Sequence, residues 1–479
     1  MFLFFRNLML GFLVLPTSAV ASGTSLPGHE LSILWSVPFA GILLTLSLAP
    51  LAIPKIWHSY YGRLSLGWAL AALIPMTLFY GVEVMLYETL HTYLLHFIPF
   101  IILIGALYTI SGGVKIDLHF PATPTTNTLL LLIASLIASL IGTTGAAMLF
   151  IRPLLVINKD RTYKTHTVIF FILLVCNIGG ALTALGDPPL FLGFLNGIDF
   201  FWPTKALFLP FVLVSVPLLI TYFVIDSIFA QKDINIRNSL QKSSTCLDKP
   251  ETKSFKRLKL SGKRNLIFLA VAIASVLLSG LWKSTFSFSI FGISVGLESL
   301  TRDGLLLLMS WCSWTFGSKA ARQDNHFTWE PLLEVARLFA AIFITAAPVI
   351  AILKAGENGS FKALMEMVTI DGAPANAMYF WLTGTLSAFL DNAPTYLVFF
   401  NMAGGDPAVL MGPLSQTLAA LSTGAVFMGA LTYIGNAPNF MVKSIAESKD
   451  VTMPGFFGYM IWSCGLLLPL FLILTFVLF

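Results

Sequence analysis

Long apolar segments, separated by short polar stretches, run through the whole 479-residue chain. A helix needs about 20 mostly apolar residues to cross a membrane. The pattern therefore predicts an all-α polytopic membrane protein. The simple segments of about that length are 33–54, 66–82, 90–112, 166–198, 204–228, 265–282, 302–317, 331–354, 414–442 and 454–479.

Two further apolar stretches, 127–157 and 375–403, are interrupted in a different way. The run Asn127–Ile141 would measure about 22 Å as a helix, whereas the hydrocarbon core is about 30 Å thick. It ends at Gly142-Thr143-Thr144-Gly145, and the second stretch is broken by Asp391-Asn392-Ala393-Pro394. Irregular backbone at this depth is tolerated only where it is buried in protein or lines a wet cavity. We therefore predict two re-entrant hairpins whose tips lie inside the membrane.

The chain also repeats itself at an offset of 249 residues. Gly180-Ala-Leu-Thr-Ala-Leu-Gly-Asp-Pro-Pro189 aligns with Gly429-Ala-Leu-Thr-Tyr-Ile-Gly-Asn-Ala-Pro438, with six of ten positions identical. The same offset places Gly142 on Asp391, so that one hairpin tip falls on the other. Chance similarity between apolar, Gly-rich helices is the simpler alternative, but the shared motif and the unbroken spacing argue against it. Each repeat then holds one hairpin and one transmembrane helix broken by Gly and Pro.

These features divide the chain into two halves. Residues 1–21 resemble a signal peptide, with Arg6 before a short apolar run and small residues at Ala19-Val20-Ala21, after which we expect cleavage. The N-terminal half, 22–228, contains hairpin 127–157 and broken helix 166–198. A basic stretch, 229–264, is predicted to be a solvated cytoplasmic linker. The C-terminal half, 265–479, contains hairpin 375–403 and broken helix 414–442.

Lys and Arg residues orient the predicted spans. With the mature N-terminus outside, the cytoplasmic connections carry 20 Lys or Arg residues and the opposite side carries five. Cytoplasmic loops of membrane proteins are enriched in these residues. The count holds only if both hairpins enter and leave on one side, and it gives the two repeats inverted orientations, as in many secondary transporters. We expect a multi-pass protein of the bacterial inner membrane, with the lipid bilayer as its principal partner.

Composition narrows the function further. Hydrophobic residues make up 57% of the chain and charged residues only 11%, against about 25% charged in an average soluble domain. This excludes a disordered protein, a nucleic-acid binder with a basic patch, and most soluble enzymes. The four Cys residues share no CxxC spacing, and no catalytic triad, metal cluster or phosphate loop is apparent. We expect no enzyme activity and no cofactor other than transported ions.

The tips and breaks supply the candidate chemistry. Free carbonyl groups at broken helices, together with Thr, Asn and Asp oxygens, suit a small hard cation, while half-helix N-termini suit an anion. Intramembrane carboxylates are costly and usually functional, although either Asp could instead cap a helix. The first predicted cation site contains Thr143, Thr144, Thr183 and Asp187, with Asn177 as a weaker candidate. The second contains Asp391, Asn392, Thr395, Thr432, Asn436 and Asn439.

At these motifs the chain resembles the ion transporter superfamily, in the branch of sodium:proton antiporters and citrate transporters. The similar runs are 142–149, 177–180, 183–189, 391–395 and 432–439. The resemblance covers nearly the whole chain after residue 21. It implies ten or eleven spans with two hairpins, a scaffold part, a moving transport part, and a homodimer. Carboxylate carriers of the superfamily have Ser-Asn-Thr at both tips, whereas this chain has Gly-Thr-Thr and Asp-Asn-Ala.

Two functions follow from this resemblance and from the buried carboxylates. The first is exchange of Na⁺ for H⁺, in which Asp187 and Asp391 bind either a proton or the metal ion. A carboxylate that is removed from water is easier to protonate. The alternative is Na⁺-coupled uptake of an organic anion such as citrate, although Asp391 places negative charge near such a substrate. A structural subunit would not need two buried, polar, broken helices.

Overall fold

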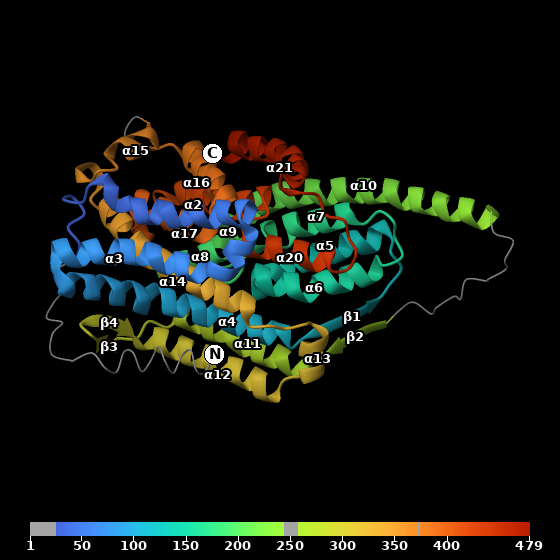
Figure 1. Ribbon diagram of the computed structural model, residues 1–479, viewed down its shortest axis with the longest axis horizontal. Helices are drawn as coiled ribbons and strands as arrows, with labels where there is room; N and C mark the ends of the chain where they lie inside the picture. Colours follow the sequence, from blue (N-terminus) through green and yellow to red (C-terminus); the bar gives the residue numbers. More distant parts are fainter. Residues whose placement is uncertain (1–24, 244–256, 371–372) are drawn as a thin grey trace.

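The computed structural model describes residues 25–243, 257–370 and 373–479. The predicted signal peptide, 1–21, lies outside these residues. The described chain is almost entirely helical (Figure 1), which confirms the predicted all-α polytopic class. The strands found within the described residues form three two-stranded antiparallel ladders.

The helices of the first half include α3, which is interrupted by non-helical backbone at Gly81, where φ is +87°. They are α2 (Val37–Ala52), α3 (Pro54–Thr92), α4 (Ile98–Gly112), α5 (Pro124–Ile141), α6 (Thr143–Ile157), α7 (Thr165–Leu174), α8 (Pro188–Leu195), α9 (Trp202–Ala206) and α10 (Phe208–Ser243). Short 3₁₀ or π turns are η1 (Ile33–Ser36), η2 (Tyr93–Phe97) and η3 (Ile178–Leu182).

The second half runs from α11 to the long apolar helix α21. Its helices are α11 (Lys263–Leu281), α12 (Leu297–Phe316), α13 (Lys319–Asp324), α14 (Glu330–Lys354), α15 (Lys362–Met367), α16 (Asn376–Phe389), α17 (Asn392–Met402), α18 (Pro407–Met411), α19 (Ser415–Met428), α20 (Ala437–Glu447) and α21 (Phe456–Leu478). Its 3₁₀ turns are η4 (Gly356–Asn358) and η5 (Gly429–Leu431).

Eight helical stretches among the described residues are long and apolar enough to cross a membrane. They are Ile33–Pro50, Ser59–Gly112, Pro124–Ile141, Thr165–Leu182, Phe208–Ile236, Lys263–Leu281, Glu330–Lys354 and Phe456–Leu478. The stretch Ser59–Gly112 is divided by Gly81. The protein is therefore a multi-pass membrane protein.

The helix boundaries at the tips and breaks recur at the predicted offset. Helices α6 and α17 begin at Thr143 and Asn392, and helices α8 and α20 begin at Pro188 and Ala437. Each pair is 249 residues apart. Local sequence favours the boundaries of α8 and α20, because Pro188 and Pro438 lie in the first turn, where the missing N–H breaks no helical hydrogen bond. In Figure 1, hairpin α5–α6 lies toward the end with β1 and β2, and α16 lies toward the opposite end beside α15. Matching boundaries support the predicted repeat, and the inverted orientation stays a prediction.

The described parts of the basic stretch 229–264, residues 229–243 and 257–264, are more regular than expected. Helix α10 continues through it to Ser243, so this helix is about 54 Å long. Strand β2 (Arg257–Ser261) then pairs with β1 (Lys115–His119), which precedes the first hairpin. The segment 230–243 contains no Gly or Pro to end the helix. After α11, strands β3 (Ser287–Ile290) and β4 (Ile293–Gly296) form a hairpin that precedes α12. A third ladder joins β5 (Thr369–Ile370) to β6 (Ala373–Pro374).

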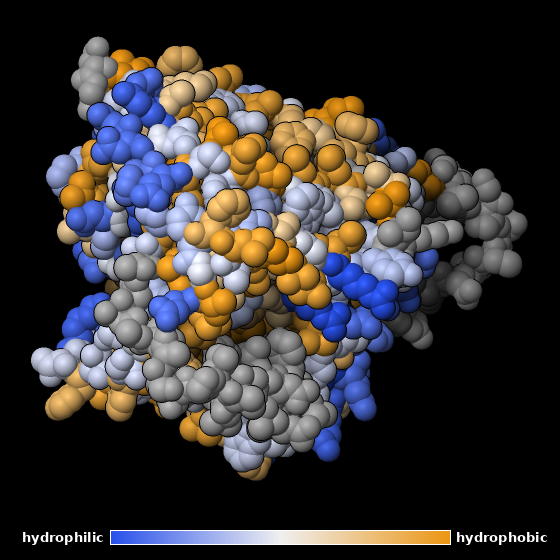
Figure 2. All heavy atoms as spheres, turned by 60° about the vertical axis from the view of Figure 1, so that its left-hand side comes forward, coloured by the Kyte–Doolittle hydropathy of each residue, from blue (hydrophilic) through white to orange (hydrophobic). Residues whose placement is uncertain are grey.

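The core and the outer surface are both apolar. Helix α7 is hydrophobic on every side, and residues 169–176 are fully buried, as expected of a central helix. On the outside, Leu281 and Phe476 are 80% and 88% exposed. Figure 2 shows hydrophobic residues across the middle of the face in view, with hydrophilic residues toward its left edge and lower right. Such a surface fits lipid contact.

Candidate functional site

The Asp187 carboxylate lies at the centre of the predicted site residues. It is 1% exposed. Its Oδ1 accepts hydrogen bonds from Thr143 Oγ1 at 2.9 Å and Asn436 Nδ2 at 3.1 Å, and its Oδ2 accepts one from Asn392 Nδ2 at 2.5 Å. The three donors belong to the first tip, the second break and the second tip. Hydrogen bonds to a charged acceptor are stronger than neutral ones, so this carboxylate joins both hairpins.

This arrangement changes the predicted grouping into two separate sites. Asn392 and Asn436 were assigned to the site of Asp391, but both donate to Asp187. Asp187 and Asn436 both have extended backbone at the breaks, with φ/ψ of −144°/146° and −150°/137°. Asn392 and Asn436 are 205 and 249 residues away from Asp187, so spacing within one half of the chain does not indicate that they meet it. The structure therefore has one polar centre to which both halves of the chain contribute.

Asp391 has a different environment at the second tip. Its Oδ1 accepts a hydrogen bond from the Ala393 backbone N–H at 3.0 Å, so it caps the N-terminus of α17. Its backbone carbonyl accepts a bond from Thr395 Oγ1 at 2.9 Å. The side chain is half-buried. Capping was the structural alternative for this residue, but it uses only one carboxylate oxygen.

Neither carboxylate has a cationic partner among the described residues. The ion pairs of the described chain are formed by other residues, and the three donors to Asp187 are neutral. No group of three His, Cys, Asp or Glu residues that could hold a metal ion is found in these residues either. The centre thus combines negative charge with neutral amide and hydroxyl groups, a set whose oxygens suit a hard monovalent or divalent cation or a proton.

Thr183 and Thr432 make equivalent hydrogen bonds to the backbone at the two breaks. Thr183 Oγ1 donates to the Ser139 carbonyl of α5, and Thr432 Oγ1 donates to the Ala388 carbonyl of α16. Each hydroxyl also accepts a backbone N–H two residues later, at 3.1 and 3.2 Å. Both donors and both acceptor residues are 249 positions apart. These two Thr residues therefore satisfy backbone groups and do not face Asp187 directly.

The two predicted Asn residues beside the breaks bond to each other. Asn177 Nδ2 donates to Asn439 Oδ1 at 2.8 Å, and Asn439 Nδ2 donates to the Gly429 and Thr432 carbonyls, both at 2.9 Å. The Oδ1 atoms of Asn177 and Asn392 are buried and have no hydrogen-bond partner within the described chain. An unsatisfied buried acceptor is costly, so these two oxygens are available to a cation.

A cavity of about 50 Å³ opens beside the first tip. Thr143, Thr144 and Asp187 line it, opposite Leu107 and Tyr108 of α4. Thr144 is half-buried, lines the cavity, and makes no side-chain hydrogen bond in the described structure. Its hydroxyl is therefore accessible to a group in the cavity. The cavity lies between the first hairpin and α4, so it gives the centre a polar opening in an otherwise apolar wall.

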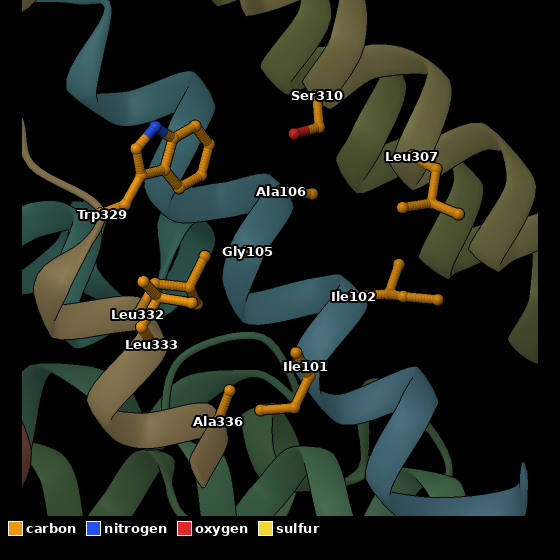
Figure 3. Close-up of a pocket in the computed structure, with 10 residues that line it drawn as sticks. All are labelled: Ile101, Ile102, Gly105, Ala106, Leu307, Ser310, Trp329, Leu332, Leu333 and Ala336. Atoms are coloured by element: carbon orange, nitrogen blue, oxygen red, sulfur yellow. The ribbon is translucent and has the colours of Figure 1, made fainter. Parts of the chain in front are cut away.

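A second cavity, of about 30 Å³, lies away from this centre and is apolar. Figure 3 shows it between α4, α12 and α14, with Trp329 on one side and Ser310 on the other. Ser310 is the one lining residue with a polar aliphatic side chain. Because it contains no charged group, this cavity does not contribute to the chemistry at Asp187.

Sequence reasoning missed a buried charge network at the base of the first hairpin. Arg161 Nη1 lies 2.6 Å from Asp226 Oδ1, and its Nε lies 3.2 Å from Asp233 Oδ2. His166 Nε2 lies 2.8 Å from the same Asp226 Oδ1, and Asn127 Nδ2 donates to Asp226 Oδ2 at 3.1 Å. The network ties both ends of hairpin α5–α6 to α10. The three groups that contact the Asp226 carboxylate are 60 to 99 residues away from it in the sequence, so no local motif indicates the network.

The family described as "Putative citrate transport" matches residues 28–479, which is nearly the whole chain. No curated protein gives a significant match. A match of this extent includes both hairpins, both broken helices and the Asp187 centre. The chain therefore belongs to this citrate transporter family, and it is a secondary transporter of the membrane.

Proposed function

We propose that the protein exchanges Na⁺ for H⁺ through the centre at Asp187 and Asp391. The observation that carries this proposal is the Asp187 carboxylate itself. It is buried, accepts hydrogen bonds from both halves of the chain, and has no ion pair in the described structure. A buried charge is costly unless it is paired. A bound cation or a proton would remove that cost, and the two compete for the same oxygens.

Competition at one carboxylate is sufficient to couple two opposite fluxes. When Na⁺ binds, the proton must leave, and when a proton binds, the Na⁺ ligand is lost. Asn392 donates to Asp187 and has an unpaired Oδ1, which supplies a neutral oxygen beside the charge, and Asn177 has a second unpaired Oδ1. Asp391 supplies a second carboxylate with one oxygen not used by its helix cap. Na⁺ would take these oxygens as ligands in place of water.

Na⁺-coupled symport of citrate or another di- or tricarboxylate is the second candidate, and the family description favours it. In that mechanism the same oxygens hold the coupling Na⁺, and the organic anion binds beside it. The negative charge of Asp391 would then need neutralisation before a carboxylate substrate could approach. In either mechanism, we propose that the protein acts in the bacterial inner membrane as a homodimer with its N-terminus outside.

One assay distinguishes the two candidates. Purified protein is reconstituted into liposomes that contain a pH-sensitive dye and an imposed pH gradient, and Na⁺ or Li⁺ is added. Na⁺-dependent dissipation of the gradient without citrate supports exchange. Radiolabelled citrate uptake that requires Na⁺, with no dissipation by Na⁺ alone, supports symport. An Asp391→Asn variant that exchanges at the full rate would contradict the role given to Asp391.

A further inference from the structure

Helices α8 and α17 run side by side away from the Asp187 centre (Figure 1). Helix α8 begins directly after Asp187, and α17 begins at Asn392, which donates a hydrogen bond to this carboxylate. The two helices therefore start at the two partners of one hydrogen bond. A change in the spacing between the helices changes the position of Asn392 relative to Asp187.

Gly193 of α8 and Tyr396 of α17 form a close contact beyond this hydrogen bond. The contact lies about 6 Å along α17 from Asn392 and about 9 Å along α8 from Asp187. A Cβ atom at Gly193 would lie 2.5 Å from the Tyr396 hydroxyl oxygen, whereas ordinary van der Waals contact begins at 3.4 Å. Glycine is an unfavourable residue inside a helix, so a packing reason is expected for it. The tyrosine hydroxyl occupies the space that a side chain at Gly193 would need.

The Tyr396 ring is held firmly on α17. Its side chain is 1% exposed, and its ring stacks on Phe400 of the same helix with a distance of 5.8 Å between ring centroids. Protein interiors are close-packed and transmit displacements, so the ring and its helix move together. Asn392 lies four residues before Tyr396 and therefore on the same face of α17. A group that pushes the hydroxyl away from α8 thus also displaces the Asn392 amide.

The repeat provides a comparison for this contact. The offset of 249 residues relates α17 to α6 and α8 to α20, and α6 and α20 also pack together. It places Tyr396 on Ala147 and Gly193 on Val442, both of which are fully buried. The larger residue of the pair thus belongs to α20 in one case and to α17 in the other. The aromatic ring is found beside the tip that carries Asn392, whose Oδ1 is buried without a hydrogen-bond partner in the described chain.

We propose that Tyr396 is a positioning residue for the cation, because its contact with Gly193 fixes the spacing of α17 and α8 and so holds the Asn392 amide at Asp187. This inference rests on the proposed cation binding at Asp187 and applies to exchange and symport alike. Binding groups have to be held within about 0.5 Å of their productive positions. A methyl group at Gly193 requires the Tyr396 hydroxyl to retreat by about 0.9 Å, from 2.5 to 3.4 Å, which exceeds that tolerance.

Na⁺-dependent thermal stabilisation of the purified full-length protein in detergent tests this role, since a ligand that binds the folded state raises the unfolding midpoint. Choline keeps the ionic strength constant. Gly193→Ala should raise the half-saturating Na⁺ concentration at least fivefold. Adding Tyr396→Phe, which removes the clashing oxygen, should restore it to within twofold of wild type. Gly41→Ala is the matched control, because its Cβ would meet the Trp68 ring between α2 and α3, which hold none of the described residues of the centre. It should lower the midpoint without changing the half-saturating concentration.

A merely structural role would lower the unfolding midpoint and leave the half-saturating Na⁺ concentration unchanged. The same concentration in wild type and a folded Gly193→Ala variant would therefore overturn the proposal, as would no restoration by Tyr396→Phe. If Gly193→Ala does not fold, Tyr396→Leu decides, because loss of the ring should raise the concentration at least threefold and an unchanged value would overturn the proposal. In these cases the wild-type response to Na⁺ remains, so the proposed cation binding stands. Wild-type protein without any Na⁺-dependent stabilisation would contradict both.

Discussion

Asp187 accepts a hydrogen bond at 3.1 Å from Asn436, the residue that follows it by 249 positions. This separation is the offset of the sequence repeat, so the two break residues that the alignment equates are in direct contact. Equivalent residues in a two-fold arrangement can touch only close to the axis that relates them. The contact therefore supports a repeat axis through the centre of the site, and it explains why the charge of one repeat meets the amide of the other.

Replacing Asp187 by Asn should abolish ion exchange while the protein remains folded. The amide keeps a similar shape but cannot bind a proton or neutralise Na⁺. Initial rates of Na⁺-driven proton flux in liposomes should fall at least tenfold. Asp406→Asn, which removes an exposed carboxylate charge at the start of α18 while the amide oxygen can still cap the helix, should leave the rate within twofold of wild type. Substantial exchange by Asp187→Asn would contradict the proposed mechanism.

Gly186→Ala should destabilise the first break severely. A Cβ atom at Gly186 would lie 2.0 Å from the Gly180 carbonyl oxygen, and a backbone atom cannot move aside as a flexible side chain can. Overpacking of this kind costs about 1–3 kcal/mol or more. The measurement is the thermal unfolding midpoint in detergent. Gly465→Ala is the control, since a Cβ there meets nothing within 4 Å and a helix gains slightly from Ala. Equal midpoints for the two variants would contradict this description of the break.

Thr183→Val and Thr432→Val should have similar effects, because their hydroxyls close equivalent backbone bonds in the two halves. Each change leaves a buried carbonyl unpaired, which costs about 1–3 kcal/mol. Thr345→Val on α14 should cost less, since that hydroxyl donates only to carbonyls within its own helix. Unfolding by denaturant in mixed micelles can rank the three variants. A large difference between the Thr183 and Thr432 variants would count against the repeat.

Arg161→Gln should loosen the base of the first hairpin. Removing this cation leaves Asp226 and Asp233 buried together without it, and breaking such a buried pair costs about 3–5 kcal/mol. Hydrogen exchange should then increase in α5, α6 and the adjoining part of α10. Lys443→Gln is the surface comparison, because the exposed pair of Lys443 and Glu447 contributes about 0–1 kcal/mol. Unchanged protection in the Arg161 variant would contradict a structural role for the network.

The sequence predicts where helices begin and end at the tips and breaks. It does not predict which side chains are hydrogen-bonded to one another there. Pro188 and Gly142 act locally, because Pro lacks an N–H and Gly142 adopts a φ of +83°. The boundaries at the tips and breaks were therefore accessible without a structure. The bond from Asn392 to Asp187 was not, since it joins the tip of one repeat to the break of the other across 205 residues. The continuation of α10 to Ser243 was also missed, because its charged residues resembled a solvated linker.

All three side chains that donate to Asp187 are neutral, and this has an electrical consequence. The described residues provide no fixed positive charge there to offset the carboxylates. The net charge of the centre therefore changes only when protons or metal ions bind to it or leave it. An elementary charge that crosses a membrane potential of 100 mV changes in energy by about 2.3 kcal/mol. The empty, deprotonated centre and the loaded centre would therefore respond differently to voltage. Whether transport generates current then depends on how many protons replace each metal ion.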